Sequence, residues 1–327
     1  MRRTIQAGKF ETGGITFSVL SESDMDRIHA ATLEVLWHNG VYVEDEEAQD
    51  VFAAGGATVD PKTKIVKIPP YVLEEAVSSA PETVILAGRN PDCDVVVDMN
   101  RVLFDPFGEG ILMVDPRTSE LRQTTKADLA EGTRLMDYLE NMDICHRIMG
   151  SLDVAQEAAA AHNAEAMLLN TTKHCFIGPQ SGYLAKKILE MIAAVVGGKE
   201  KIAERPIMTF GTALVTPLKM VKDFCQIIMT TSRSGLPVEI LGQGMAGGSS
   251  PVTLAGALVT HNAEVLSGVV LSQLTQKGAP CFYGSSACSM DLRDGSAVVG
   301  NPETALLSAA TAQMARKYLL PSWIAGG

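Results

Sequence analysis

A glycine-rich segment from Gly242 to Val252 is the densest group of residues that could do chemistry. It includes Gly248 and Ser249, and it is expected where an apolar strand gives way to a helix. Backbone N–H groups in such a turn can bind an anion such as a phosphate or a carboxylate. The spacing matches neither a Walker loop nor a dinucleotide fingerprint. The segment predicts either a tight loop that lines a site or a turn required only by the backbone.

The expected helix that follows carries two titratable residues, His261 and Glu264, on one face. This spacing can serve a metal site or an acid and base pair. It is equally typical of side chains that hydrogen-bond within a helix interface. An acid such as Glu264 in a very apolar segment is costly unless it is paired or functional.

The next strand-like run ends in Tyr283 and Ser285, and acidic residues follow at Asp291 and Glu303. In parallel barrels the carboxyl ends of the strands and the loops after them build the active site. These residues are therefore on the side where a site is expected. Glu303 also stands in the first turn of an expected helix, where the helix dipole alone favours an acid.

Two adjacent pairs, Cys145-His146 and His174-Cys175, raise the possibility of zinc binding. On a strand, neighbouring side chains face opposite sides, so at most one member of each pair can reach a common centre. We therefore predict no metal site. The six cysteines show no CxxC pair or disulfide-framework spacing and are expected to be reduced. The later strands contain no lysine, which argues against a Schiff-base aldolase.

The composition excludes several classes of protein. With 327 residues and 46% hydrophobic content, the chain can bury a large core. A net charge of -11 disfavours nucleic acid as a partner. No uninterrupted apolar run approaches the roughly 18 residues of a membrane helix. The N-terminal segment Met1–Lys9 has no apolar core and predicts no secretory signal, so the expected location is the cytoplasm.

The chain changes character near residue 125. Before that point, a helix over 21–39, with Ser21 or Ser23 at its start and Gly40 at its end, precedes short alternating runs separated by turn residues. These runs, at 64–68, 83–86, 94–97, 102–104 and 110–114, indicate antiparallel hairpins. We predict that residues 1–125 form an N-terminal cap of helix and β-hairpins.

From residue 126 onward, apolar strands alternate with helical stretches. The strand cores lie near Cys145, Cys175, Met208, Glu239, Phe282 and Trp323, and the helical stretches cover 153–170, 183–196, 218–234, 254–276 and 301–318. This alternation predicts βα units on a parallel sheet, either doubly wound or closed into a barrel. We predict an α/β fold in which residues 126–327 form an incomplete (β/α)8 TIM-type barrel of about six βα units. The final run, 320–327, ends without a covering helix, so we expect a longer parent chain.

Several long motifs resemble the trimethylamine methyltransferase family. They are residues 247–252, 254–256, 258–268, 283–286, 302–303 and 320–326, and the match spans essentially the whole chain, including 21–43 and 67–69. The resemblance implies a (β/α)8 barrel that moves a methyl group from trimethylamine to the Co(I) of a separate, cognate corrinoid protein, with no cofactor bound directly. In the trimethylamine branch the next residue, position 328, is pyrrolysine, encoded by an amber codon. The 327-residue chain is then an inactive fragment that stops before this residue.

The resemblance and the residue types together predict a site for a methylated amine. The predicted catalytic residues are Glu264, Glu303 and Asp291, and the predicted substrate-binding residues are Tyr283, His261, Trp323, Ser285, Gly248 and Ser249. Aromatic faces of Tyr283, Phe282 and Trp323 suit a cationic amine, and the acids balance its charge. The expected partner is the corrinoid protein, with neither nucleic acid nor membrane involved, and the full-length protein is expected to be a homo-oligomer.

Two other functions compete with this one. A pyrrolysine-free branch of the family demethylates glycine betaine or related quaternary amines, and here the glycine-rich loop or Arg293 would hold the carboxylate of betaine. Alternatively, the polypeptide is a non-catalytic product of termination. An open barrel would expose a strand edge at 320–327 and apolar helix faces, which predicts aggregation or rapid degradation.

Overall fold

A computed structural model describes residues 9–10, 18–99, 101–106, 108 and 110–326. The described chain forms two compact units, one of residues 9–10, 84–211 and 234–237 and the other of residues 18–83, 212–233 and 238–326. The predicted boundary at residue 125 lies inside the first unit, so the division into cap and barrel remains a prediction about sequence regions. Most of Met1–Lys9 and the last residue, Gly327, lie outside the described residues.

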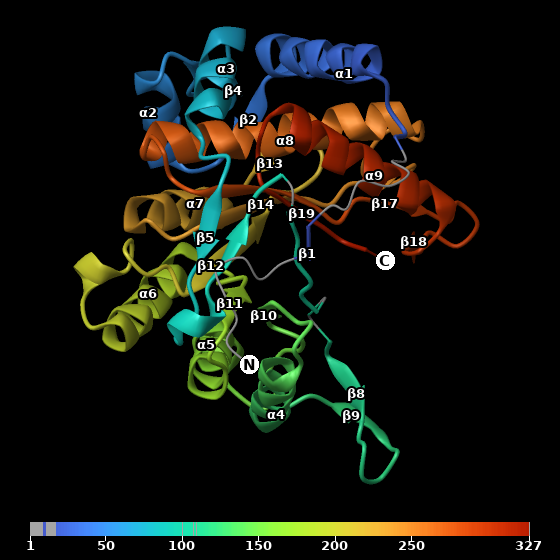
Figure 1. The fold of residues 1–327 in the computed structure, drawn as a ribbon. Coiled ribbons are helices and arrows are strands. Elements are labelled where there is room, and N and C mark those ends of the chain that lie inside the picture. Colours follow the sequence, from blue (N-terminus) through green and yellow to red (C-terminus); the bar gives the residue numbers. More distant parts are fainter. Residues whose placement is uncertain (1–8, 11–17, 100, 107, 109, 327) are drawn as a thin grey trace. The chain divides into compact units, whose positions relative to one another are not determined.

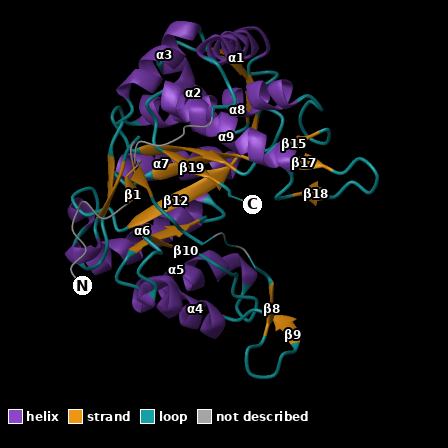
Figure 2. Cartoon of the chain, turned by 45° about the vertical axis from the view of Figure 1, so that its right-hand side comes forward, coloured by secondary structure: helices purple, strands orange, loops and turns teal. Residues whose placement is uncertain are grey.

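The first unit contains three parallel strands with helices between them (Figure 1). Its strands are β10 (Ile144–His146), β11 (His174–Ile177) and β12 (Met208–Ala213), and its helices are α4 (Lys126–Tyr138), α5 (Ala159–Asn170) and α6 (Gly182–Val196). Three antiparallel pairs accompany them: β1 (Lys9–Phe10) with β7 (Arg101–Val102), β5 (Val84–Leu86) with β6 (Val95–Val97), and β8 (Leu112–Val114) with β9 (Leu121–Gln123). The β8–β9 hairpin extends away from α4 (Figure 2).

The second unit contains the remaining parallel strands, β14 (Val238–Gly242), β16 (Cys281–Ser285) and β19 (Ser322–Ile324). Its longer helices are α1 (Glu22–Glu34), extended by a π-helical turn (Val35–Asn39), α2 (Glu46–Ala54), α3 (Pro70–Ser79), α7 (Lys222–Ser234), α8 (Leu254–Thr275) and α9 (Pro302–Lys317). A small sheet has the order β13 (Lys219–Met220), β2 (Val41–Val43), β4 (Ile65–Lys67), β3 (Thr58–Asp60). Another has the order β15 (Met245–Ala246), β17 (Cys288–Met290), β18 (Ala297–Val298).

Helix α8 is the centre of the second unit, and α1, α2, α3 and α9 pack around it (Figure 1). It starts at the N-cap Thr253, whose side chain accepts from the Gly256 N–H, and 15 of its 22 residues are buried. A helix that is apolar on all sides is typical of such a central position. By length and composition α8 could cross a membrane, but 72% of its apolar window is buried in the unit, as in the core helix of a soluble protein.

The predicted order of strands and helices is confirmed, and all six predicted strand cores lie in parallel strands of the described residues. The α/β class is therefore correct, whereas closure as an eight-stranded barrel remains a prediction. Two helix starts were predicted too early. A 3-10 turn (Gln156–Ala158) precedes α5, and α7 starts at Lys222 because Lys219 and Met220 pair with β2 instead.

Candidate functional site

The candidate site is the face of β14, β16 and β19 that is turned away from α8. Strand register places Glu239 beside Phe282, and Trp323 beside Gly284, on this face. Side chains on a strand alternate, so Tyr283 belongs to the other face, where its hydroxyl reaches Asn262 of α8. We call the face that carries Glu239, Phe282, Gly284 and Trp323 the inner face.

Glu239 is the acid of the inner face, and its side chain is only 3% exposed. It lies directly over Gly284, since a Cβ added to that glycine would be 2.5 Å from the Glu239 Oε1 atom. The strand around it forms because Val238 and Ile240 are fully buried on the opposite face. A carboxylate attracts a cationic ligand, and this attraction is stronger in a buried setting than in water.

Two aromatic side chains accompany this acid. Phe282 is buried and Trp323 is half-buried. An aromatic face attracts a cation electrostatically, and tryptophan does so most strongly. The inner face therefore offers one carboxylate and aromatic surface, a combination suited to a small alkylated ammonium ion.

Two predicted substrate-binding residues, Tyr283 and His261, lie behind the strand and not on the inner face. Tyr283 is fully buried and its hydroxyl donates to the Asn262 side chain at 2.7 Å. The His261 Nε2 atom lies 3.2 Å from the carbonyl oxygen of Gly284. The structure thus brings them together in the interface between α8 and β16.

Glu264 also holds the fold from within α8. Its two carboxylate oxygens accept from the Leu218 N–H at 2.9 Å and from the Thr216 hydroxyl at 3.1 Å. The side chain is fully buried, and this burial raises the pKa of Glu264 to about 7 despite the two hydrogen bonds, which lower it. Glu264 therefore secures the loop that connects β12 to α7.

Replacing Glu264 with Gln should change how stability depends on pH. A carboxyl whose pKa rises from 4.5 to about 7 on folding stabilises the fold when protonated, and this contribution is lost as pH rises through 7. Relative to Glu264→Gln, the wild type should lose about 2 to 3 kcal/mol of unfolding free energy between pH 5 and pH 8. Urea unfolding of both proteins at each pH measures this difference, and a difference that does not vary with pH would contradict it.

Two of the predicted acids, Asp291 and Glu303, line an open cleft of about 440 Å³ beside the glycine-rich loop. Asp291 forms an ion pair with Arg293 at 2.6 Å, and the Arg293 side chain is 90% exposed. Arg293 holds the pKa of Asp291 below its usual value through these hydrogen bonds. The charge of Arg293 is thus already balanced by its neighbour.

Two backbone amides of the glycine-rich loop form hydrogen bonds within the loop itself. The Gly248 N–H donates to the Met245 carbonyl, and the Met245 N–H donates to the Ser249 hydroxyl, both at 3.0 Å. Helix α8 begins only at Leu254, so these amides are not at its N-terminus. The loop was predicted either to line a site or to be a turn required only by the backbone, and these two amides are engaged within it. Ser285, another predicted binding residue, is buried, and its hydroxyl accepts from the Ala287 N–H.

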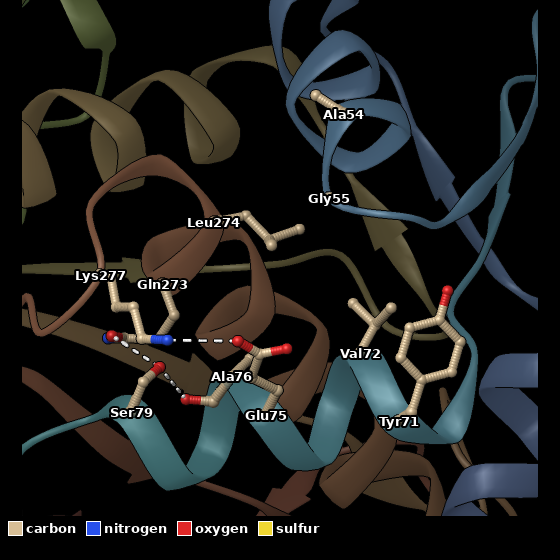
Figure 3. Close-up of a pocket in the computed structure, with 10 residues that line it drawn as sticks. All are labelled: Ala54, Gly55, Tyr71, Val72, Glu75, Ala76, Ser79, Gln273, Leu274 and Lys277. Atoms are coloured by element: carbon tan, nitrogen blue, oxygen red, sulfur yellow. Dashed lines mark hydrogen bonds and ion pairs between the residues drawn. The ribbon is translucent and has the colours of Figure 1, made fainter.

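A smaller cavity, of about 250 Å³, lies between α2, α3 and the end of α8 (Figure 3). Its charged groups, Glu75 and Lys277, pair with each other at 3.2 Å. The Ser79 hydroxyl donates to the Ala76 carbonyl at 2.9 Å. None of the predicted site residues lines this cavity, so we do not assign the site to it.

The first unit holds the two Cys-His pairs, and its geometry follows the expected alternation. Cys145 and Cys175 are register neighbours and buried, while His146 contacts Asp105 at 3.0 Å. His174 lies between the Ala87 carbonyl and the Thr209 hydroxyl. Among residues 18–99, 101–106, 108 and 110–326, no group of three His, Cys, Asp or Glu side chains could hold a metal ion.

Comparison with known protein families shows to which family this chain belongs. The model of the family described as trimethylamine methyltransferase (MTTB) matches residues 3–327. The chain belongs to the trimethylamine methyltransferase family. This match confirms the resemblance seen in the sequence motifs, which include the segment that starts at Tyr283 and the terminal segment that contains Trp323.

Curated relatives cover 95 to 100% of this chain. The trimethylamine methyltransferase of Desulfitobacterium hafniense is 46% identical over 100% of this chain and 66% of its own length. That of Methanosarcina thermophila is 38% identical over 98% of this chain and 67% of its own length. A glycine betaine methyltransferase of D. hafniense strain Y51 is 33% identical over 95% of this chain. The chain thus spans about two thirds of the length of its relatives.

A solved structure supports the fold of this family member. The monomethylamine methyltransferase of Methanosarcina barkeri matches with a TM-score of 0.54, covering 93% of this chain and 66% of that protein. The two sequences are only 11% identical, so this likeness concerns the fold alone.

Sequence reasoning places Glu239 only in the middle of a strand and does not identify it as a candidate site residue. A signal was present, because an acid interrupts the apolar run Val238–Leu241 of an expected buried strand. Acids are almost never fully buried without a partner or a function. This criterion was applied to Glu264 in an apolar helix. It would also have found Glu239 if it had been applied to the interiors of strands.

Proposed function

We propose that this protein, as part of a longer chain, transfers a methyl group from trimethylamine to the cobalt of a corrinoid held by a partner protein. Family membership supports a methyltransferase that acts on methylated amines, and the relatives from D. hafniense and M. thermophila are trimethylamine methyltransferases. Substrate, acceptor and partner are proposals here, since the chain spans only 66% of the D. hafniense relative.

The observation that carries the proposal is the buried carboxylate of Glu239 beside Phe282 and Trp323 on the inner face. Trimethylamine is a monocation when protonated and has no acidic group. One carboxylate balances its charge, and aromatic surface contacts its methyl groups. The site therefore matches both the charge and the apolar shell of this substrate.

In this proposal the residues bind and orient the substrate, with little acid or base catalysis. The bond between nitrogen and one methyl carbon breaks, its electron pair stays on nitrogen, and the proton already on nitrogen leaves with dimethylamine. The methyl group passes to the Co(I) acceptor of the partner, which must be in line with the breaking bond. In this proposal the Glu239 side chain contacts the cation and holds it in place.

Glycine betaine fits the inner face less well than trimethylamine. Betaine carries a carboxylate next to its quaternary nitrogen, and Glu239 would repel it. Arg293, the residue expected to hold that carboxylate, already pairs with Asp291 and lies in the cleft. We therefore place betaine second, although one relative is a glycine betaine methyltransferase.

The full-length product of the gene tests this assignment directly. Incubated with a reduced corrinoid protein from the same organism, it should demethylate trimethylamine and methylate the cobalt, which the corrinoid absorption spectrum reports. Glycine betaine at the same concentration should react far more slowly. Faster reaction with betaine, or methylation with neither amine, would reject the proposal.

Three further expectations accompany this function. Sequencing the gene beyond codon 327 tests whether position 328 is pyrrolysine. Light scattering after size-exclusion chromatography tests whether the full-length protein is a homo-oligomer, and fractionation of cells tests the cytoplasmic location.

A soluble 327-residue polypeptide with a cooperative melt would count against the view that this polypeptide is a product of termination that aggregates.

A further inference from the structure

A buried chain of hydrogen bonds crosses the second unit from α1 to β16. The Tyr318 hydroxyl lies 3.0 Å from His29 Nδ1 and accepts from the Asn262 side-chain amide at 2.8 Å. The Asn262 carbonyl oxygen accepts from the Tyr283 hydroxyl at 2.7 Å. His261, next to Asn262 in α8, bonds separately to the Gly284 carbonyl, and its Nδ1 atom lies 3.4 Å from the Tyr283 hydroxyl. We call His29, Tyr318, Asn262, Tyr283 and His261 the α8 network.

The partners fix the direction of each hydrogen bond. The Gly284 carbonyl can only accept, so His261 carries its proton on Nε2 and donates at 3.2 Å. The Tyr283 hydroxyl gives its proton to Asn262, and it lies at 3.4 Å from His261 Nδ1. Burial lowers the pKa of His261 to about 4, which keeps the imidazole neutral near pH 7. The carbonyl contact requires a proton on Nε2, and the neutral imidazole supplies it in this tautomer.

The α8 network ends at Gly284, the glycine that the candidate amine-binding acid, Glu239, contacts. Gly284 receives the His261 hydrogen bond at its carbonyl, while the Glu239 carboxylate fills the space that a Cβ of Gly284 would occupy. The His261 ring is also closely fitted, since a Cβ on Gly242 would lie 2.4 Å from its Cδ2 atom. A shift of β16 would therefore move the surface that supports Glu239.

We propose that His261 is a positioning residue, which through its hydrogen bond to Gly284 and the α8 network holds β16 where it fixes the Glu239 carboxylate. The inference rests on the proposed function, because Glu239 matters only if it binds the amine. His261 itself does not touch the substrate. Displacement of a positioned group by about 1 Å can cost about 100-fold in rate, so the effect should be measurable.

Two substitutions at His261 separate the hydrogen bond from the packing. His261→Gln keeps a side-chain N–H that can donate to the Gly284 carbonyl, whereas His261→Phe keeps the ring but has no donor. In the full-length protein, His261→Phe should lower kcat/KM for trimethylamine at least about tenfold, and His261→Gln should restore it to within about threefold of wild type. If the two variants lose activity equally, the hydrogen bond is not the cause and the proposal fails.

A double-mutant cycle with Glu239→Gln tests whether His261 acts through that acid. The double variant should lose little more activity than Glu239→Gln alone, because the group to be positioned no longer carries charge. Additive losses would overturn the proposal. If His261→Phe does not fold, His261→Leu, which also lacks a donor, replaces it in the same cycle with the same two outcomes.

Ser272→Ala is the matched control, since Ser272 is buried in the same helix and bonds to Ser232 of α7 at 2.9 Å without reaching β16. It should lower stability but leave kcat/KM unchanged, and an equal loss of kcat/KM would mean that activity merely follows stability. A wild type with no methyl transfer would reject the proposed function. A wild type that is active while His261→Phe matches it would reject only this inference.

Discussion

Replacement of Glu239 with Gln is expected to lower kcat/KM for trimethylamine by at least about 100-fold in the full-length protein, the loss expected when one partner of a buried charge pair is removed. Gln has nearly the same shape, so the contact with Gly284 is kept and only the negative charge is lost. In the Glu239→Gln variant, a cation on the inner face would lie in an apolar setting with no negative charge to balance it. Steady-state kinetics with the corrinoid partner measure the effect.

Two other glutamates serve as controls for Glu239→Gln. Glu82 is exposed, and Glu82→Gln should leave kcat/KM unchanged. Glu303 lines the cleft, and if the amine bound there, Glu303→Gln would show the large loss instead. A Glu239→Gln enzyme with nearly full activity would contradict the assignment of the inner face.

The largest expected effect on stability comes from Tyr283→Ala. Tyr283 is fully buried, so its removal leaves a cavity, and large aromatic-to-alanine changes cost about 3 to 5 kcal/mol. The side-chain oxygen of Asn262 also loses the hydrogen bond that it accepts from the Tyr283 hydroxyl. We expect a loss of about 4 kcal/mol in the free energy of unfolding, measured by urea denaturation.

The same change at Tyr71 is the matched control, because that side chain is 63% exposed in the same unit. Tyr71→Ala should cost less than about 1 kcal/mol. Tyr283→Phe, which keeps the ring, should cost about 1 to 2 kcal/mol through the lost hydrogen bond. Equal losses for Tyr71→Ala and Tyr283→Ala would show that burial of Tyr283 does not stabilise the unit.

The order of the six parallel strands and of the helices between them followed from the sequence because hydrophobic period and capping residues are local signals, whereas α2, α3 and α4 were not predicted. Ser21 was one of two predicted N-caps of α1, and the structure confirms it, with Asp24 completing the capping box. The start of α7 was missed because the pairing of Lys219 and Met220 with β2 joins segments far apart in sequence. Such pairing overrides local propensity and leaves no local trace.

The site was only partly predictable, for a reason of strand geometry. Placing residues at the carboxyl end of β16 pointed to a strand of the candidate site, but neighbouring side chains face opposite sides. Trp323 and Phe282 are on the inner face, whereas Tyr283 and Ser285 belong to the other. Which side is covered by α8 depends on the packing of Asn262 and His261, and this cannot be read from one strand alone.

The glycine-rich loop shows the same limit. Its glycines suggested exposed amides, but the Gly248 N–H and the Met245 N–H donate to acceptors inside the loop. Whether an amide is available depends on the turn geometry, which composition does not specify. Glu264 was correctly recognised as an unusual buried acid, and the structure supplies its partners, Thr216 and Leu218.

The central claim is that the inner face binds the alkylated ammonium group. A crystal structure of the full-length protein with tetramethylammonium, a cation of fixed charge, tests it most directly. We predict the cation beside the Glu239 carboxylate and within about 6 Å of the centre of the Trp323 ring. A cation bound in the cleft lined by Asp291 and Glu303, with the inner face empty, would contradict the claim.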